Sequence, residues 1–175
     1  MKSIIPVDIF GKCTENETLK YPRDSKEEKE FLSKYKFYIA FENSRCPNYV
    51  TEKLYKVLNL TLSDNPPVPV VMGPKKSWYE ENLPYNSFIH VDDYKSPEEL
   101  AKYLLHQDTN NEEYLTYLNW RRNYQQVCEP RVRCRLCEFL LKRKSEITND
   151  LHKEEDTYPA IADFKSFWQK AKCYD

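Results

Sequence analysis

The chain has 175 residues, which is enough for one domain with a packed core and too few for two ordinary α/β domains. Its 27 Lys and Arg residues nearly balance 28 Asp and Glu residues, and the net charge of −1 gives no electrostatic case for a nucleic-acid partner. Aromatic residues make up 14% of the sequence and only 2 residues are glycine, whereas disordered chains contain few aromatics. We therefore expect one folded domain that does not bind nucleic acid.

The first elements are predicted from one apolar run and one capping motif. Residues 4–10 are mostly apolar and precede a glycine, which predicts a buried strand. Ser25 and Glu28 have the spacing of a capping box, which predicts that a short helix begins after the serine.

Strands and helices are then predicted to alternate. Continuous apolar runs at 37–41, 68–72 and 88–91 are typical of strands buried in a parallel sheet. A helical pattern fills residues 49–60, between the first two runs, and two more helices are expected from Ser96 onward and over 110–124. This alternation favours an α/β fold with a Rossmann-like parallel sheet and flanking helices.

Cysteines and glycosylation triplets together favour the secretory pathway. Asn16 and Asn59 each begin an acceptor triplet. Cys134 and Cys137 have the spacing of a zinc or redox pair, but zinc needs two more ligands, and neither His106 nor His152 is suitably placed. The spacing argument favours disulfide chemistry over a metal site, and no metal is expected.

One disulfide can be predicted from the order of the strands. Cys13 and Cys46 each follow a predicted strand, and the ends of these strands should be neighbours in the sheet. A disulfide requires Cα atoms within about 7 Å, which neighbouring strand ends can provide. We therefore expect a bond between Cys13 and Cys46.

Polar residues gather where ligands bind to parallel sheets, beyond the carboxyl ends of the strands. Glu42 and Asn43 directly follow the first of the three apolar runs. Tyr49, Glu52 and Lys53 have i, i+3 and i+4 spacing, so a helix would place them on one face, with a free amino end that suits phosphate. The alternative is that Glu52, Lys53 and Lys56 form only the solvated side of an amphipathic helix.

The motifs also resemble a known family. The segments FYIAFENS at 37–44, YVTEKL at 49–54, VPVVMGP at 68–74 and SFIHVDD at 87–93 are similar to the signature of the α1,3-fucosyltransferases, in the same order. The resemblance covers roughly residues 5–137. It implies the C-terminal half of a GT-B glycosyltransferase, which transfers fucose from GDP-fucose to N-acetylglucosamine with inversion and uses no cofactor or metal.

By position in these motifs, the resemblance implies that Asn43, Tyr49, Glu52 and Lys53 line the GDP-fucose site, with Glu42 as a further candidate. Lys53 would contact the diphosphate, Glu52 the sugar hydroxyls and Tyr49 the nucleotide. The Asp92-Asp93 pair belongs to a strand-end motif of the family, so we interpret it as structural. No catalytic residue is assigned within this chain.

The resemblance also sets expectations for domains and location. Residues 1–137 would form the GDP-fucose-binding domain, incomplete at its N-terminus, and residues 138–175 a tail with one helix near 164–171. The acceptor domain, the catalytic base and a type II membrane anchor would lie outside this chain, in a Golgi enzyme whose second partner is a glycan acceptor. The alternative is an inactive donor-binding or interaction module.

Overall fold

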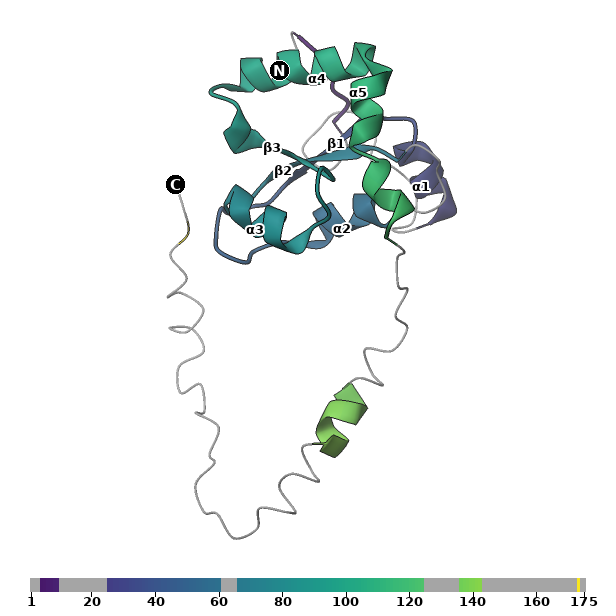
Figure 1. The fold of residues 1–175 in the computed structure, drawn as a ribbon, viewed down its shortest axis with the longest axis vertical. Helices are drawn as coiled ribbons and strands as arrows, with labels where there is room; N and C mark the ends of the chain where they lie inside the picture. Colours follow the sequence, from purple (N-terminus) through teal and green to yellow (C-terminus); the bar gives the residue numbers. More distant parts are fainter. Residues whose placement is uncertain (1–3, 10–24, 61–65, 125–135, 143–172, 174–175) are drawn as a thin grey trace. The chain divides into compact units, whose positions relative to one another are not determined.

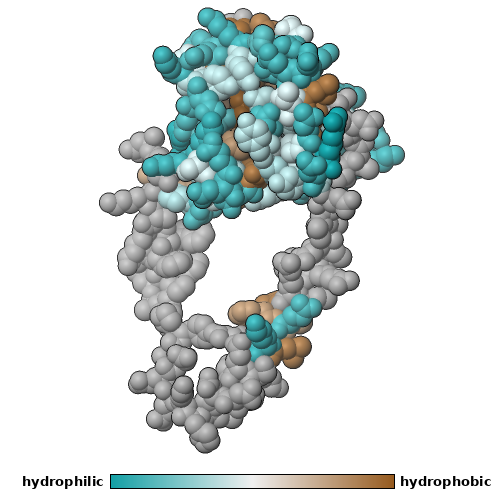
Figure 2. Space-filling view, in the orientation of Figure 1, coloured by the Kyte–Doolittle hydropathy of each residue, from teal (hydrophilic) through white to brown (hydrophobic). Residues whose placement is uncertain are grey.

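The computed structural model describes residues 4–9, 25–60, 66–124, 136–142 and 173. The chain divides into two compact units, one of Met1–Gln125 with Lys172–Asp175 and one of Gln126–Ala171. In the second unit, residues 136–142 form a helix with apolar side chains at its surface (Figure 2). The helix expected near 164–171 lies outside the described residues, and the expected domain limits stay a prediction.

A parallel sheet of three strands in the order β1-β2-β3 forms the centre of the first unit. Strand β1 (Phe37–Phe41) pairs along its whole length with β2 (Val68–Met72), and β2 pairs with the short strand β3 (Ile89–His90). The predicted α/β fold with a parallel sheet is therefore confirmed. The third strand is shorter than expected because a 3-10 helix, η1 (Val91–Asp93), begins directly after His90.

Helices cover both faces of this sheet (Figure 1). On one face, Val68 and Val70 pack with residues of α4 and α5; on the other, Val71 packs with residues of α2 and α3. Successive residues of a strand point to opposite faces, so one continuous apolar strand supplies both cores. The helices are α1 (Lys26–Leu32), α2 (Glu52–Leu58), α3 (Lys76–Asn82), α4 (Pro97–Thr109), α5 (Asn111–Thr116) and the 3-10 helix η2 (Asn119–Arg122).

Two of the helix starts follow the capping prediction. The Ser25 hydroxyl accepts the Glu28 backbone N–H at 3.1 Å, and the Ser96 hydroxyl accepts the Glu99 N–H at 3.2 Å. The long helix expected over 110–124 is instead divided into α5 and η2. Helix α3 was not predicted, because its buried residue Tyr79 follows Trp78 directly and no repeating apolar pattern extends through its seven residues.

The prediction of a strand at residues 4–10 is wrong. The described residues 4–9 form no strand, although Ile5 is buried in the core beside Val68 and Val70. Pro6 cannot donate a backbone hydrogen bond to a neighbouring strand, and Ile9 is 42% exposed. The apolar run therefore packs on the sheet without joining it.

Candidate functional site

The loop between β1 and α2 carries the candidate residues. Its first residue, Glu42, continues the sheet pairing, because its backbone N–H donates to the Met72 carbonyl at 2.7 Å. Further along, the Tyr49 N–H donates to the Cys46 carbonyl at 3.2 Å and closes a turn. Within that turn Asn48 has a φ of 60°, a left-handed conformation that asparagine tolerates better than most residues.

Glu42 is the most buried charged residue of this loop, with only 5% of its surface exposed. Its Oε1 accepts the Thr51 backbone N–H at 2.7 Å, and its Oε2 accepts the Thr51 hydroxyl at 2.7 Å. The same Oε2 lies 3.3 Å from the Lys53 ammonium. These bonds meet the usual condition for burying a carboxylate, which is that hydrogen bonds and an opposite charge replace its water.

Lys53 is held by two oxygen atoms and remains accessible. Its ammonium donates to the Thr51 hydroxyl at 2.9 Å as well as to Glu42, and 36% of its side chain is exposed. Glu52 lies at the edge of this group, with its Oε1 3.9 Å from the ammonium and 75% of its side chain exposed. A cation therefore faces solvent at the carboxyl end of β1, next to the exposed carboxylate of Glu52.

Helix α2 begins three residues later than the sequence pattern suggested. It starts at Glu52, so Tyr49 lies in the preceding loop and does not share a helical face with Glu52 and Lys53. The Thr51 N–H is bonded to Glu42 and is not free for a phosphate group, contrary to the expectation of an open helix start. Asn43 is exposed on the same loop, and Tyr49 is half-buried.

Gly73 allows the close packing behind this site. A Cβ atom added at Gly73 would lie 2.8 Å from the Tyr79 hydroxyl and 3.0 Å from the Glu42 Cγ, so any larger residue would press on both side chains. Burial, with a contribution from the negative charge of Glu42, raises the pKa of Tyr79 well above its usual range. The space beside Glu42 is thus filled by a neutral, buried phenol.

The other end of α2 is capped by Arg121 of η2. Its guanidinium donates to the carbonyls of Leu58 and Leu60 at 3.1 Å and of Val57 at 3.4 Å, and it lies over the Trp120 ring. Carbonyls at a helix end lack partners within the helix, so the guanidinium gives a donor to Leu58 and Leu60 and a second one to Val57, whose carbonyl also accepts the Leu60 N–H at 3.1 Å. Desolvation by burial lowers the pKa of Arg121. Nothing in the sequence pattern indicated this role.

Lys56 does not lie on the solvated side of α2, where the helical pattern of the sequence placed it. Its ammonium lies 2.6 Å from the Glu28 carboxylate of α1, and the two side chains are 24% and 8% exposed. This ion pair joins α1 to α2. Lys56 is therefore structural and differs from Lys53 in its surroundings.

The end of β3 carries a second group of charges. Asp92 pairs with Arg45 at 2.5 Å and Asp93 pairs with Lys76 at 2.7 Å, in agreement with a structural role for the two aspartates. The His90 ring, next to Asp92, is fully buried. Its Nδ1 accepts the Asp92 N–H at 3.1 Å and its Nε2 lies 3.3 Å from the Pro74 carbonyl, an arrangement that fits a neutral imidazole donating through Nε2.

Among the described residues, no group of three or more His, Cys, Asp or Glu side chains could hold a metal ion. Within those same residues, no helix is long and apolar enough to cross a membrane. Asn59 is exposed at the end of α2, while Asn16 lies outside the described residues; glycosylation at both stays a prediction.

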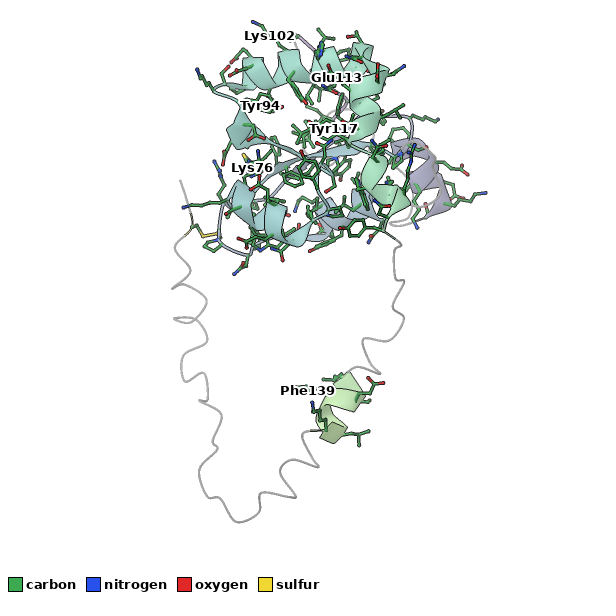
Figure 3. The ribbon with its side chains drawn as sticks, in the orientation of Figure 1. Lys76, Tyr94, Lys102, Glu113, Tyr117 and Phe139 are labelled. Carbon is green, nitrogen blue, oxygen red and sulfur yellow. A yellow bond between two sulfur atoms is a disulfide. The ribbon has the colours of Figure 1, made fainter. Side chains whose placement is uncertain are left out.

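The disulfide prediction is wrong in its pairing. Cys46 is bonded to Cys173, which lies 127 residues away in the sequence, and is therefore not available to Cys13 (Figure 3). Cys13 and Cys134 lie outside the described residues. Cys137 is free and exposed. The bond attaches residue 173 to the loop that also carries Asn43 and Tyr49.

Comparison with known proteins identifies the family. A model described as glycosyltransferase family 10 (fucosyltransferase) C-term matches residues 1–159, which is most of the chain. The chain belongs to glycosyltransferase family 10. The predicted membership of the fucosyltransferases, which are transferases, is confirmed.

Relatives of this family 10 chain are considerably longer. It is 53% identical over 93 residues to human 4-galactosyl-N-acetylglucosaminide 3-alpha-L-fucosyltransferase 9, covering 53% of this chain and 24% of the relative. It is 42% identical over 125 residues to 3-galactosyl-N-acetylglucosaminide 4-alpha-L-fucosyltransferase FUT3 of Pongo pygmaeus, covering 71% of this chain and 31% of that relative. The chain thus matches about a quarter to a third of their length.

Among solved structures, the crystal structure of an alpha1,3-fucosyltransferase aligns with 60% of this chain and 27% of its own, at 30% identity and a TM-score of 0.46.

Proposed function

We propose that this chain provides the GDP-fucose-binding part of a fucosyltransferase that transfers fucose to N-acetylglucosamine of a glycan. The observation that carries the proposal is the Lys53 ammonium, which is held at the carboxyl end of β1 and remains partly exposed in a family 10 chain. Ligands of parallel sheets bind at this end of the strands. GDP-fucose places a diphosphate there, and a lysine ammonium is a common partner for phosphate.

The proposed roles follow from the chemistry of fucose transfer. As the bond to fucose breaks, negative charge develops on the departing GDP, and a fixed cation at Lys53 stabilises this charge. The exposed Glu52 carboxylate accepts hydrogen bonds from sugar hydroxyls. Asn43 and Tyr49, on the same loop, contact the nucleotide.

We further propose that the base that deprotonates the acceptor hydroxyl belongs to a segment outside these 175 residues, together with the acceptor-binding domain of a GT-B enzyme. General-base catalysis contributes roughly 10²–10⁴-fold to a reaction rate, and positioning of the acceptor contributes further. We therefore expect the chain to bind GDP-fucose without measurable transfer. In the complete protein we propose a Golgi location, with the catalytic domain in the lumen.

Calorimetric titration with GDP tests the donor site. Lys53→Ala should weaken GDP binding by about 1.5–3 kcal/mol, the range for a hydrogen bond to a charged group, which corresponds to a roughly 10- to 150-fold higher Kd. Lys102→Ala is the matched control, because Lys102 is exposed on α4 (Figure 3). Equal losses in both variants would indicate diffuse charge effects, and no loss in Lys53→Ala would remove Lys53 from the donor site.

A further inference from the structure

We propose that Glu42 is a positioning residue, which holds the Lys53 ammonium in the orientation that receives a phosphate group without touching that group itself. This inference rests on the proposed function, since it takes Lys53 as the residue that meets the GDP diphosphate. The Glu42 side chain is only 1% exposed, so its carboxylate is closed to a ligand that approaches from solvent. Its oxygens face Thr51 and Lys53 instead.

The contacts with Glu42 and Thr51 use two of the three N–H donors of the Lys53 ammonium. A lysine ammonium has three N–H donors. One is directed at the Glu42 Oε2, 3.3 Å away, and one at the Thr51 hydroxyl, 2.9 Å away. The third remains for a group arriving at the exposed part of the side chain. Because Thr51 also donates its own hydroxyl to Glu42, the three residues form a closed triangle that fixes the position of the ammonium.

Such an arrangement lowers the cost of binding an anion. A free lysine side chain samples many rotamers, and an anion that binds it must restrict that motion. The contacts with Glu42 and Thr51 restrict it before the anion arrives. The negative charge of Glu42 acts in the opposite direction, because it repels a diphosphate. The two effects predict opposite outcomes when that charge is removed, which makes the inference testable.

Glu42→Gln separates anchoring of Lys53 from capping of α2. The amide oxygen can still accept the Thr51 N–H, whereas the amide nitrogen that replaces Oε2 cannot accept a bond from the Lys53 ammonium. GDP and guanosine should be titrated by calorimetry into the wild-type chain, Glu42→Gln, Lys53→Ala and the double variant. Guanosine has no phosphate, so it reports on the remainder of the site.

Positioning predicts that Glu42→Gln raises the Kd for GDP about 3- to 10-fold, the size of one ordinary hydrogen-bond contribution, and leaves the Kd for guanosine and the urea midpoint unchanged. It also predicts that Glu42→Gln has no further effect in the Lys53→Ala background, because the anchored group is already absent. If Glu42→Gln does not fold, Thr51→Val removes the second anchor of Lys53 and should produce the same phosphate-dependent loss.

Other results would overturn the inference. Unchanged or tighter GDP binding in Glu42→Gln, with a loss in Lys53→Ala, would show that Lys53 works without its anchor. An equal loss for GDP and guanosine, or the same loss in the Lys53→Ala background, would show that Glu42 acts only through the fold. Failure of the proposed function differs from all of these, because Lys53→Ala itself would then bind GDP like the wild-type chain, and the inference would fail with it.

Discussion

Replacing Lys56 with methionine should destabilise the fold, although the sequence places Lys56 only three residues from Lys53 in a row of charges. The ammonium lies 2.6 Å from Glu28, whose side chain is 8% exposed, while the lysine side chain is 24% exposed. Removing one partner of a fully buried ion pair costs about 3–5 kcal/mol. Because about a quarter of Lys56 reaches solvent, water can replace part of the interaction, and we expect a loss of about 2 kcal/mol.

Urea unfolding followed by circular dichroism measures this loss. With a slope of about 2 kcal/mol per M, typical for a small domain, the midpoint of Lys56→Met should fall by about 1 M. The double variant Glu28→Met with Lys56→Met should recover most of the loss, because it leaves no unpaired buried charge. Lys102→Met, at an exposed position of α4, is the matched control. If Lys56→Met unfolds at the same urea concentration as this control, the ion pair contributes nothing.

Three further changes test the surroundings of the site. Arg121→Ala should lower the free energy of unfolding by about 2 kcal/mol, because three carbonyls at the end of α2 lose a charged donor; a urea midpoint equal to that of the wild-type chain would contradict this. Gly73→Ala should cost about 1–3 kcal/mol by pressing on Tyr79 and Glu42, and thermal melting with no shift would refute the close packing. Burial lowers the pKa of His90, so the unfolded chain binds a proton at this histidine more readily than the folded chain does. Lowering the pH below about 6.5 should therefore reduce the free energy of unfolding, by at most about 1.4 kcal/mol per pH unit, whereas above this pH His90 should cause no such loss. An NMR titration with a His90 midpoint above 6.5 would contradict the last prediction.

The strands could be predicted from the sequence because local composition determines them. Strand β2 lies in the middle of the sheet, is buried at four of its five positions and is apolar throughout, as a strand covered on both faces must be. Strand β1 is equally apolar but lies at the edge of the sheet, where Ala40 is its one buried residue and Ile39 is 40% exposed. Both runs are bounded by polar or proline-containing segments. The predicted boundaries of β1 and β2 match the structure. The segment at residues 4–9 shows the limit of this rule, because an apolar run also fits a chain that packs on a sheet without pairing.

The contacts around the candidate site depend on residues far apart in the sequence, and no local pattern contains them. Glu42 fixes the start of α2 from nine positions before Thr51, so the helical spacing of Tyr49 with Glu52 suggested a shared face that does not exist. Cys46 is bonded to a cysteine 127 residues away, which follows no predicted strand and so has no local feature that marks it as the partner. Motif resemblance named the site residues but not the contacts among them.

Helix α2 shows why these distant contacts matter for the candidate site. It has only seven residues, and isolated helices shorter than about 12–15 residues are marginal in water. Its conformation must therefore depend on tertiary contacts: burial of Leu54 and Val57, the Glu42 carboxylate at its start and the Arg121 guanidinium at its end. Lys53 lies in its first turn. The position of the proposed phosphate-binding cation is consequently set by the same contacts that hold the helix on the sheet, so a change at Arg121 can weaken donor binding without approaching the donor.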